Sequence, residues 1–142
     1  MLRYPLTHPV MLGALAAAGH GSRVLLADGN YPHATAVSPR ATVVHLNLRP
    51  GLVGVLDVLE TVLTAVDIEA ATMMRPDGDS EPEVFADFRR LLPGLALQRL
   101  ERQAFYRAAS APDVTLAVAT GEQRWYANLL LTIGAISPAE HA

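Results

Sequence analysis

The chain of 142 residues contains no cysteine and no lysine, and only 6% of its residues are aromatic. The lack of cysteine excludes disulfide bonds, thiolate catalysis and cysteine-ligated metal sites. Because arginine carries all the positive side-chain charge apart from histidine and the net charge is −3, there is no basic field for a nucleic acid. No apolar run reaches the roughly 18 residues that cross a bilayer. We therefore expect neither nucleic acid nor membrane as a partner.

The composition predicts one globular domain over residues 1–142, since 51% of the residues are hydrophobic and only 18% are charged. So few charges on a small domain favour an oligomer whose subunits cover apolar surface. The apolar segment Val10–Ala18 follows a stretch whose only basic residue is Arg3, so a short signal peptide is one interpretation. We interpret it instead as an amphipathic helix that ends at Gly19, which predicts a cytoplasmic protein.

Apolar spacing and turn residues predict helices and strands that alternate along the chain. The expected helices cover residues 9–18, 52–66, 80–92 and 102–109, and the expected strands cover residues 23–27, 42–46, 68–74, 96–100, 114–119 and 126–133. Ser80 and Glu83 are predicted to form a capping box at the start of the third helix. This alternation predicts an α/β fold, a single layered domain with a central mixed or parallel sheet flanked by helices.

A first candidate for chemistry is His20, which lies between Gly19 and Gly21 directly after the first predicted helix. The glycines allow a ligand to approach closely, and an imidazole exchanges protons near neutral pH. The alternative is an ordinary helix cap in which His20 is an incidental polar residue.

Polar side chains elsewhere suggest a binding site. Asp28 follows a buried strand, at the kind of edge where α/β folds bind ligands, although it also suits an Asx turn. Arg102 and Tyr106 are one helical turn apart, and Tyr126 and Asn128 are expected on one side of a strand. Each pair is also compatible with an ordinary solvated surface.

Metal and cofactor motifs are absent from the sequence. The histidines show no metal-ligand spacing, residues 77–79 are too short for a calcium loop, and no glycine-rich nucleotide motif occurs. We therefore expect neither a metal nor a cofactor.

Several of these segments, taken in order, resemble one protein family. They are Gly19-His20-Gly21 with Asp28-x-x-x-Pro32, Met73-Met74, Pro82-Glu83-Val84, Arg102 to Tyr106, Thr120-Gly121-Glu122 and Tyr126-Ala127-Asn128. Together they resemble the RbsD/FucU family (D-ribose pyranase and L-fucose mutarotase) over nearly the whole chain, and they are closer to the L-fucose mutarotase branch.

The resemblance implies an isomerase that interconverts anomers or ring forms of a free monosaccharide, preferably L-fucose-like, without a cofactor. It also implies a ring-like homo-oligomer, often a decamer, with sites near subunit contacts. By the same resemblance His20 is the catalytic general acid and base, and the substrate-binding residues are Asp28, Arg102, Tyr126 and Asn128.

The sequence departs from the family pattern at three positions. Ser22 and Asn30 stand where an acidic residue and a histidine are usual, and Ala127 replaces a glycine. These differences leave open a non-catalytic sugar-binding oligomer of the same fold. A structural or regulatory oligomer without a small ligand is the second alternative.

Overall fold

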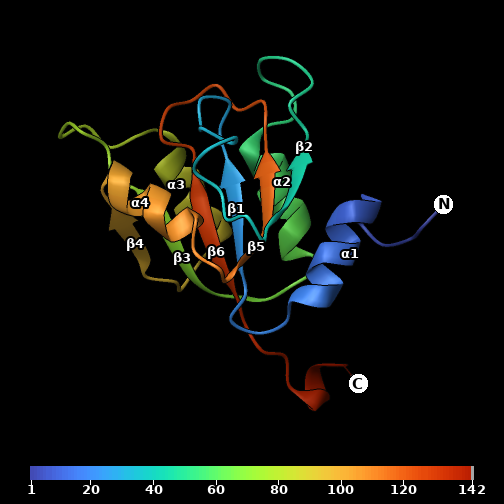
Figure 1. Cartoon of the computed structure of the whole chain (residues 1–142). Helices are drawn as coiled ribbons and strands as arrows, with labels where there is room; N and C mark the ends of the chain where they lie inside the picture. The colour runs from blue at the N-terminus through green and yellow to red at the C-terminus, as the bar shows by residue number, and fades with distance from the viewer. Residues whose placement is uncertain (142) are drawn as a thin grey trace.

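A computed structural model describes residues 1–141 and contains one six-stranded sheet flanked by helices (Figure 1). The strands are β1 (Arg23–Ala27), β2 (Thr42–His45), β3 (Ile68–Met74), β4 (Leu97–Leu100), β5 (Val114–Ala119) and β6 (Leu129–Ile133). The helices are α1 (Pro9–Ala18), α2 (Val55–Leu63), α3 (Val84–Leu91) and α4 (Arg102–Ala109), and a short 3₁₀ helix covers Pro138–His141. The predicted α/β class is confirmed.

The sheet is mixed, with the order β2-β5-β1-β6-β3-β4. β1 pairs in parallel with β5, β5 with β2, and β3 with β4, whereas β6 is antiparallel to both β1 and β3. Five strands therefore point one way and only β6 runs in reverse. The loops that follow β1, β3, β4 and β5 consequently meet the loop that precedes β6 at one edge of the sheet.

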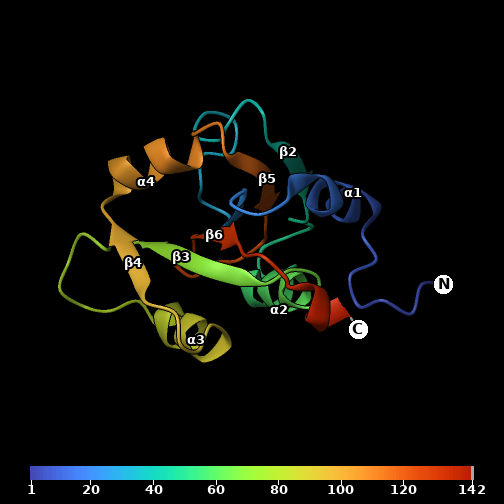
Figure 2. The same ribbon diagram turned by 90° about the horizontal axis from the view of Figure 1, so that it is seen from below.

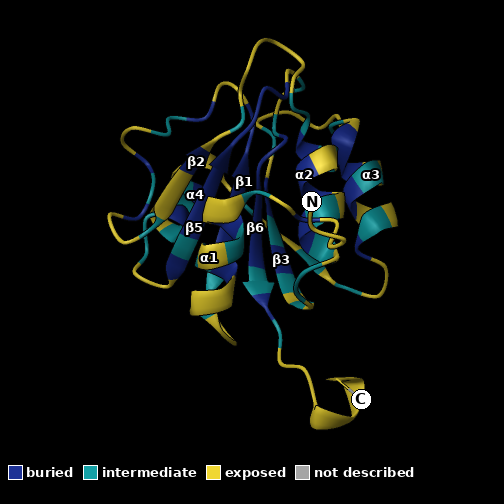
Figure 3. Cartoon of the chain, turned by 90° about the vertical axis from the view of Figure 1, so that its right-hand side faces the viewer, coloured by how far each residue is buried: buried dark blue, intermediate teal, exposed yellow. Residues whose placement is uncertain are grey.

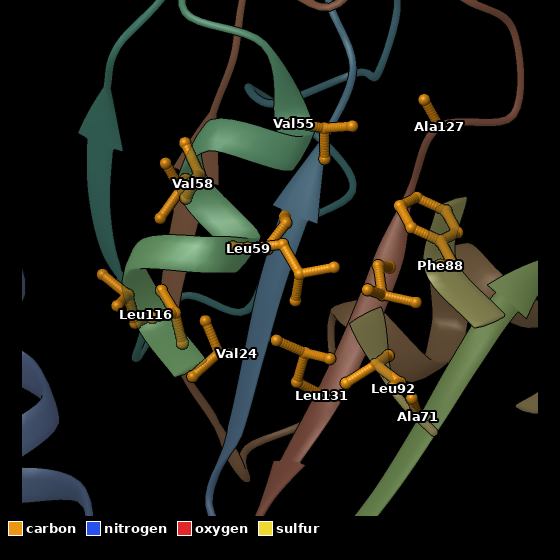
Figure 4. Close-up of a cluster of buried hydrophobic side chains, with 14 of the residues drawn as sticks. Val24, Val55, Val58, Leu59, Ala71, Phe88, Leu92, Leu116, Ala127 and Leu131 are labelled. Carbon is orange, nitrogen blue, oxygen red and sulfur yellow. The ribbon is translucent and has the colours of Figure 1, made fainter. Parts of the chain in front are cut away.

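Side chains of the central strands alternate between two cores. Val24 and Leu26 of β1 belong to the larger core, which α1, α2 and α3 cover, while Leu25 and Ala27 belong to a smaller core beneath α4. Figure 2 shows α2 and α3 on one side of the sheet and α4 on the other. In Figure 4, side chains of α2 and α3 meet those of β1 and β6 in the larger core.

Two helices begin later than the sequence predicts. α2 begins at Val55 rather than at residue 52, because Gly54 is an extended N-cap whose amide donates to Asp57 Oδ2 at 3.1 Å. α3 begins at Val84 rather than at residue 80, so the predicted capping box of Ser80 and Glu83 is wrong. Ser80 lies in a bend there instead, and residues 81 and 82 have no regular secondary structure.

α1 is apolar around its whole circumference, so the prediction that this helix is amphipathic is wrong. Met11 and Leu15 are buried against the sheet, yet Val10 on the outer side is 47% exposed. Figure 3 shows that the outward surface of α1 is largely exposed, in contrast to the buried central strands. Within residues 1–141, no helix has the length and apolar character that a membrane crossing requires.

Candidate functional site

Asp28 and Asn128 lie side by side at the edge where β1 ends and β6 begins. The backbone amide of Asp28 donates to Asn128 Oδ1 at 2.8 Å, and Asn128 Nδ2 donates to Asp28 Oδ2 at 3.2 Å. Both residues are only 3% exposed. The antiparallel pairing of β1 with β6, in which Leu26 faces Leu129, brings these residues together although 100 positions separate them.

The turn after β1 fixes the Asp28 carboxylate. The Asn30 amide donates to Asp28 Oδ1 at 3.0 Å, and His33 Nε2 lies 3.1 Å from the Asp28 carbonyl oxygen. Burial raises the pKa of Asp28 above its ordinary value, and the hydrogen bonds from Asn30 and Asn128 act in the opposite direction. The carboxylate is therefore oriented and partly desolvated, which suits an acceptor for ligand hydroxyl groups.

These residues form part of the wall of an open cavity of about 460 Å³. The lining residues are Asp28, Asn30, Tyr31, Met74, Asp77, Arg102, Tyr106, Trp125, Tyr126 and Asn128. They combine hydrogen-bonding groups with aromatic and thioether surface, on a scale that fits a small polar ligand. All four predicted substrate-binding residues are among them.

Arg102 begins α4 and contacts two other residues of the cavity wall. Its Nη2 lies 2.5 Å from Asp77 Oδ2 and 3.5 Å from the Tyr126 hydroxyl oxygen, to which the Asp77 amide also donates at 3.3 Å. The start of α4, the turn before β6 and the loop after β3 thus meet at one cluster. From the sequence, Asp77 belongs only to a segment too short for a calcium loop, and its position three residues before a predicted helix gives no signal for a site.

Tyr126 does not belong to a strand, so the prediction that β6 begins there is wrong. Its φ of 60° is left-handed, and β6 begins only at Leu129. Tyr126 and Asn128 reach the same cavity through this turn rather than through strand alternation. The adjacent Trp125 is 75% exposed at the cavity wall, where its ring can stack on a ligand.

A charged network holds the loop before Tyr126. Glu122 Oε1 and Oε2 each accept from the Arg124 guanidinium at 3.0 Å, and Oε2 also accepts from the Val55 amide at 3.3 Å. Arg124 Nη1 in turn lies 3.1 Å from Asp87 Oδ2. Burial acts to raise the pKa of Glu122, but hydrogen bonds and ion pairing with Arg124 together lower it below its ordinary value. The loop is therefore tied to both α2 and α3.

His20 lies at the opposite end of the sheet from this cavity within one chain. It precedes β1, whereas Asp28 follows it, and Figure 1 shows the loop between α1 and β1 at the end away from the site loops. The five residues of β1, at about 3.3 Å each, separate the two ends by roughly 17 Å. The His20 side chain is 59% exposed and contacts Glu69, with Nε2 2.9 Å from Oε2. The predicted site residues Asp28, Arg102, Tyr126 and Asn128 therefore converge on the cavity, whereas His20 does not.

The side chains that line the cavity suit a neutral polyhydroxy ligand. A carboxylate, an amide, a guanidinium and a phenol offer both donors and acceptors, and flat aromatic surface lies beside them. Among residues 1–141, no group of three histidine, aspartate or glutamate side chains is arranged to hold a metal ion.

Comparisons with known proteins show which family this chain resembles along its length. The model of the RbsD / FucU transport protein family matches residues 1–136. The chain is 32% identical over 134 residues to the D-ribose pyranase of Symbiobacterium thermophilum, covering 94% of this chain and 98% of that protein. It is also 32% identical to the human fucose mutarotase, covering 93% and 91% of the two chains.

A solved structure with the same fold is that of Bacillus subtilis RbsD complexed with D-ribose. The two structures superpose with a TM-score of 0.84 at 22% sequence identity, over 96% of this chain and all of the other. The predicted fold class is therefore confirmed by a known structure as well as by the sheet order.

Proposed function

Because the chain belongs to the RbsD/FucU family, we propose that it is a monosaccharide mutarotase, an isomerase that interconverts anomers or ring forms of a free sugar. The observation that carries this proposal is the cavity in which Asp28, Arg102, Tyr126 and Asn128 converge from three parts of the chain. These groups bind and orient a sugar without needing a metal or a redox cofactor.

The reaction opens a cyclic hemiacetal and closes it again. A proton is delivered to the ring oxygen, the bond from that oxygen to the anomeric carbon breaks, and the anomeric hydroxyl loses its proton as the carbonyl forms. Rotation of the open form then lets the ring close on the other carbonyl face or through another hydroxyl. A group that exchanges protons near neutral pH accelerates such steps by about 10²–10⁴-fold.

His20 is the general acid and base in this proposal, and a second copy of the chain supplies it. The His20 side chain is exposed at the far end of the sheet, so it does not reach the cavity of its own chain. The neighbouring helix α1 presents apolar residues such as Val10 to the outside, which suits a contact between subunits. A homo-oligomer, for which the family resemblance implies a ring such as a decamer, thereby completes each site.

The shared position of four residues on the cavity wall supports their proposed substrate-binding roles. The Asp28 carboxylate accepts from sugar hydroxyls, the Asn128 amide supports it, and Arg102 and the Tyr126 hydroxyl bind further hydroxyls. Trp125 covers one face of the ring.

L-fucose is our preferred substrate over D-ribose. Met74 and Tyr106 give the cavity apolar surface beside its polar groups, which suits the methyl group of a 6-deoxy sugar. The sequence also resembles the L-fucose mutarotase branch at Phe105-Tyr106 and Met73-Met74. We place the enzyme in the cytoplasm, where free sugars of this kind are metabolised.

The direct test is anomer exchange measured by NMR saturation transfer with L-fucose, D-ribose, L-rhamnose and D-galactose. The wild-type protein should accelerate exchange of L-fucose most, and His20→Ala should slow it by about 10²–10⁴-fold. Sugar binding without accelerated exchange would instead favour the non-catalytic binding protein.

Mixed oligomers test whether two chains build each site. Below saturating sugar, His20→Ala and Asp28→Asn should each exchange slowly alone, because one lacks the acid and the other binds the sugar weakly. When the two chains are refolded together in equal amounts, about one quarter of composite sites combine both intact halves, which restores exchange. No recovery in verified mixed oligomers would exclude a site shared between chains.

A further inference from the structure

The loop that carries His20 is held firmly against the sheet. Gly19 and Gly21 on either side have left-handed φ values of 81° and 84°, which glycine adopts without strain. The Gly21 amide donates to the carbonyl oxygen of Ile133 at 2.9 Å, so the loop is fixed to the end of β6. The backbone around His20 is thus fixed, and its side chain depends on what the imidazole contacts.

The His20 imidazole contacts Glu69, which lies where the pairing register between β3 and β6 shifts. Ile68 pairs with Ile133 of β6 and Ala70 pairs with Thr132, so β3 contains one residue more than β6 at this step. Such a bulge changes the direction of a side chain within a strand. Glu69 is the extra residue, and its Oε2 lies 2.9 Å from His20 Nε2.

Ser22, two residues after His20, does not take this role. Its hydroxyl donates to the carbonyl oxygen of Ala18 at 2.8 Å, which completes the end of α1. The acceptor at the imidazole therefore comes from β3, about 50 positions further along the chain.

From this geometry we infer that Glu69 is a positioning residue for His20, an inference that rests on the proposed function. A carboxylate at Nε2 retains the proton of the neutral imidazole on that nitrogen and sets the ring orientation. Nδ1 is then the nitrogen that faces the sugar. The imidazolium gives its Nδ1 proton to the ring oxygen and remains as the Nε2–H form, hydrogen-bonded to Glu69.

Assembly strengthens this pair. In a single chain the His20 and Glu69 side chains are 59% and 46% exposed, and exposed ion pairs are weak in water. When another subunit covers the loop, the pair is partly desolvated and its attraction increases. The assembled protein is therefore the form in which the experiments are done.

Kinetics of Glu69→Gln test the inference. Exchange measured by NMR should show kcat reduced by about tenfold, since a hydrogen bond to a charged group is lost, while KM changes by less than about twofold. Glu60→Gln removes an exposed carboxylate from α2 and serves as the matched control, with wild-type kinetics expected. Thermal unfolding should be unchanged in both variants, which separates positioning from folding.

The two variants distinguish the role of Glu69 from the proposed role of His20 as the general acid and base. If His20→Ala retains the wild-type rate, the proposed acid and base role is wrong. If His20→Ala is slow while Glu69→Gln has the wild-type kcat, only the role of Glu69 is overturned.

A spectroscopic measurement is independent of activity. In protein labelled with ¹⁵N-histidine, long-range ¹H–¹⁵N correlations identify the tautomer of each neutral ring, and the spectrum of His20→Ala assigns His20. We expect the Nε2–H tautomer in the wild type and a loss of that preference in Glu69→Gln. An Nδ1–H tautomer in the wild type, or an identical tautomer in both proteins, would overturn the inference.

Discussion

Asp28 and Asn128 exchange two hydrogen bonds, from the Asp28 amide to Asn128 Oδ1 at 2.8 Å and from Asn128 Nδ2 to Asp28 Oδ2 at 3.2 Å. Asp28 directly follows β1 and Asn128 directly precedes β6, so the pair links these two strands and also forms part of the cavity wall. Fold stability and ligand binding therefore depend on the same contact.

Asn128→Ala should damage both properties. It leaves the buried Asp28 amide without its acceptor, which should lower the free energy of unfolding by about 1–3 kcal/mol in chemical denaturation. Sugar binding should weaken in the same variant. Asn47→Ala, at an exposed position on an adjacent loop, is the control and should lie within about 0.5 kcal/mol of the wild type. Equal stabilities for the two variants would contradict this account.

Trp125 should report sugar binding directly. It is the only tryptophan in the chain, it is 75% exposed, and it lines the cavity. A bound sugar should shield the indole from water, so the fluorescence maximum should move to shorter wavelength and saturate with concentration. Trp125→Phe should abolish the signal while exchange activity persists at a reduced level, because phenylalanine still offers a stacking face. A saturating ligand that leaves the emission unchanged would place the sugar away from Trp125.

Arg124→Met should destabilise the loop that leads to Tyr126. Glu122 would lose both guanidinium donors and keep only backbone partners, so we expect a loss of about 1–3 kcal/mol in unfolding free energy. KM for the sugar should rise as well, since Trp125 and Tyr126 follow directly. Arg89→Met, which breaks a pair with Glu81 on the exposed surface, is the matched control and should change little. An unchanged KM in Arg124→Met would show that the contacts of Arg124 do not affect sugar binding.

Most of the fold could be predicted because hydrophobic periodicity is strong in this sequence. The bounds of α1, α4, β1, β3 and β5 match the predicted ranges. The largest errors occur at the starts of α2, α3 and β6, where local backbone conformation decides which residue begins the element. An apolar residue such as Leu52 continues the helical spacing of α2, but extended Gly54 stops the helix from reaching it. Ser80 and Glu83 have the spacing of a capping box without its geometry.

The site could be predicted only in part. Asp28 was identifiable because a polar residue at the end of a buried strand marks the binding edge of an α/β sheet. Tyr126 was expected in a strand, since a left-handed φ in a tyrosine has no sequence signal. Asp77 and Glu69 gave no local signal either, because their partners Arg102 and His20 are distant in sequence. Such contacts follow from sheet order, which periodicity does not determine.

The buried position of Asp28 predicts how sugar affinity depends on pH. Desolvation raises its pKa above the ordinary value of 3.8, against the opposing hydrogen bonds of Asn30 and Asn128. The ionised carboxylate accepts from sugar hydroxyls at both oxygens, and protonation removes part of that capacity. Affinity should therefore be complete at neutral pH and decline as pH falls through the raised pKa, at higher pH than for an exposed aspartate. Fluorescence titrations of Trp125 at decreasing pH measure this directly.

Asp28→Asn supplies the control for this dependence. It should bind sugar about 10- to 100-fold more weakly at neutral pH, because a charged acceptor is lost, and its affinity should not follow the same decline. Because sugar binding favours the carboxylate, wild-type binding in the acidic range should also release protons, which calorimetry in buffers of different ionisation enthalpy detects. A wild-type affinity that stays constant until the protein unfolds would show that the Asp28 carboxylate does not contact the sugar.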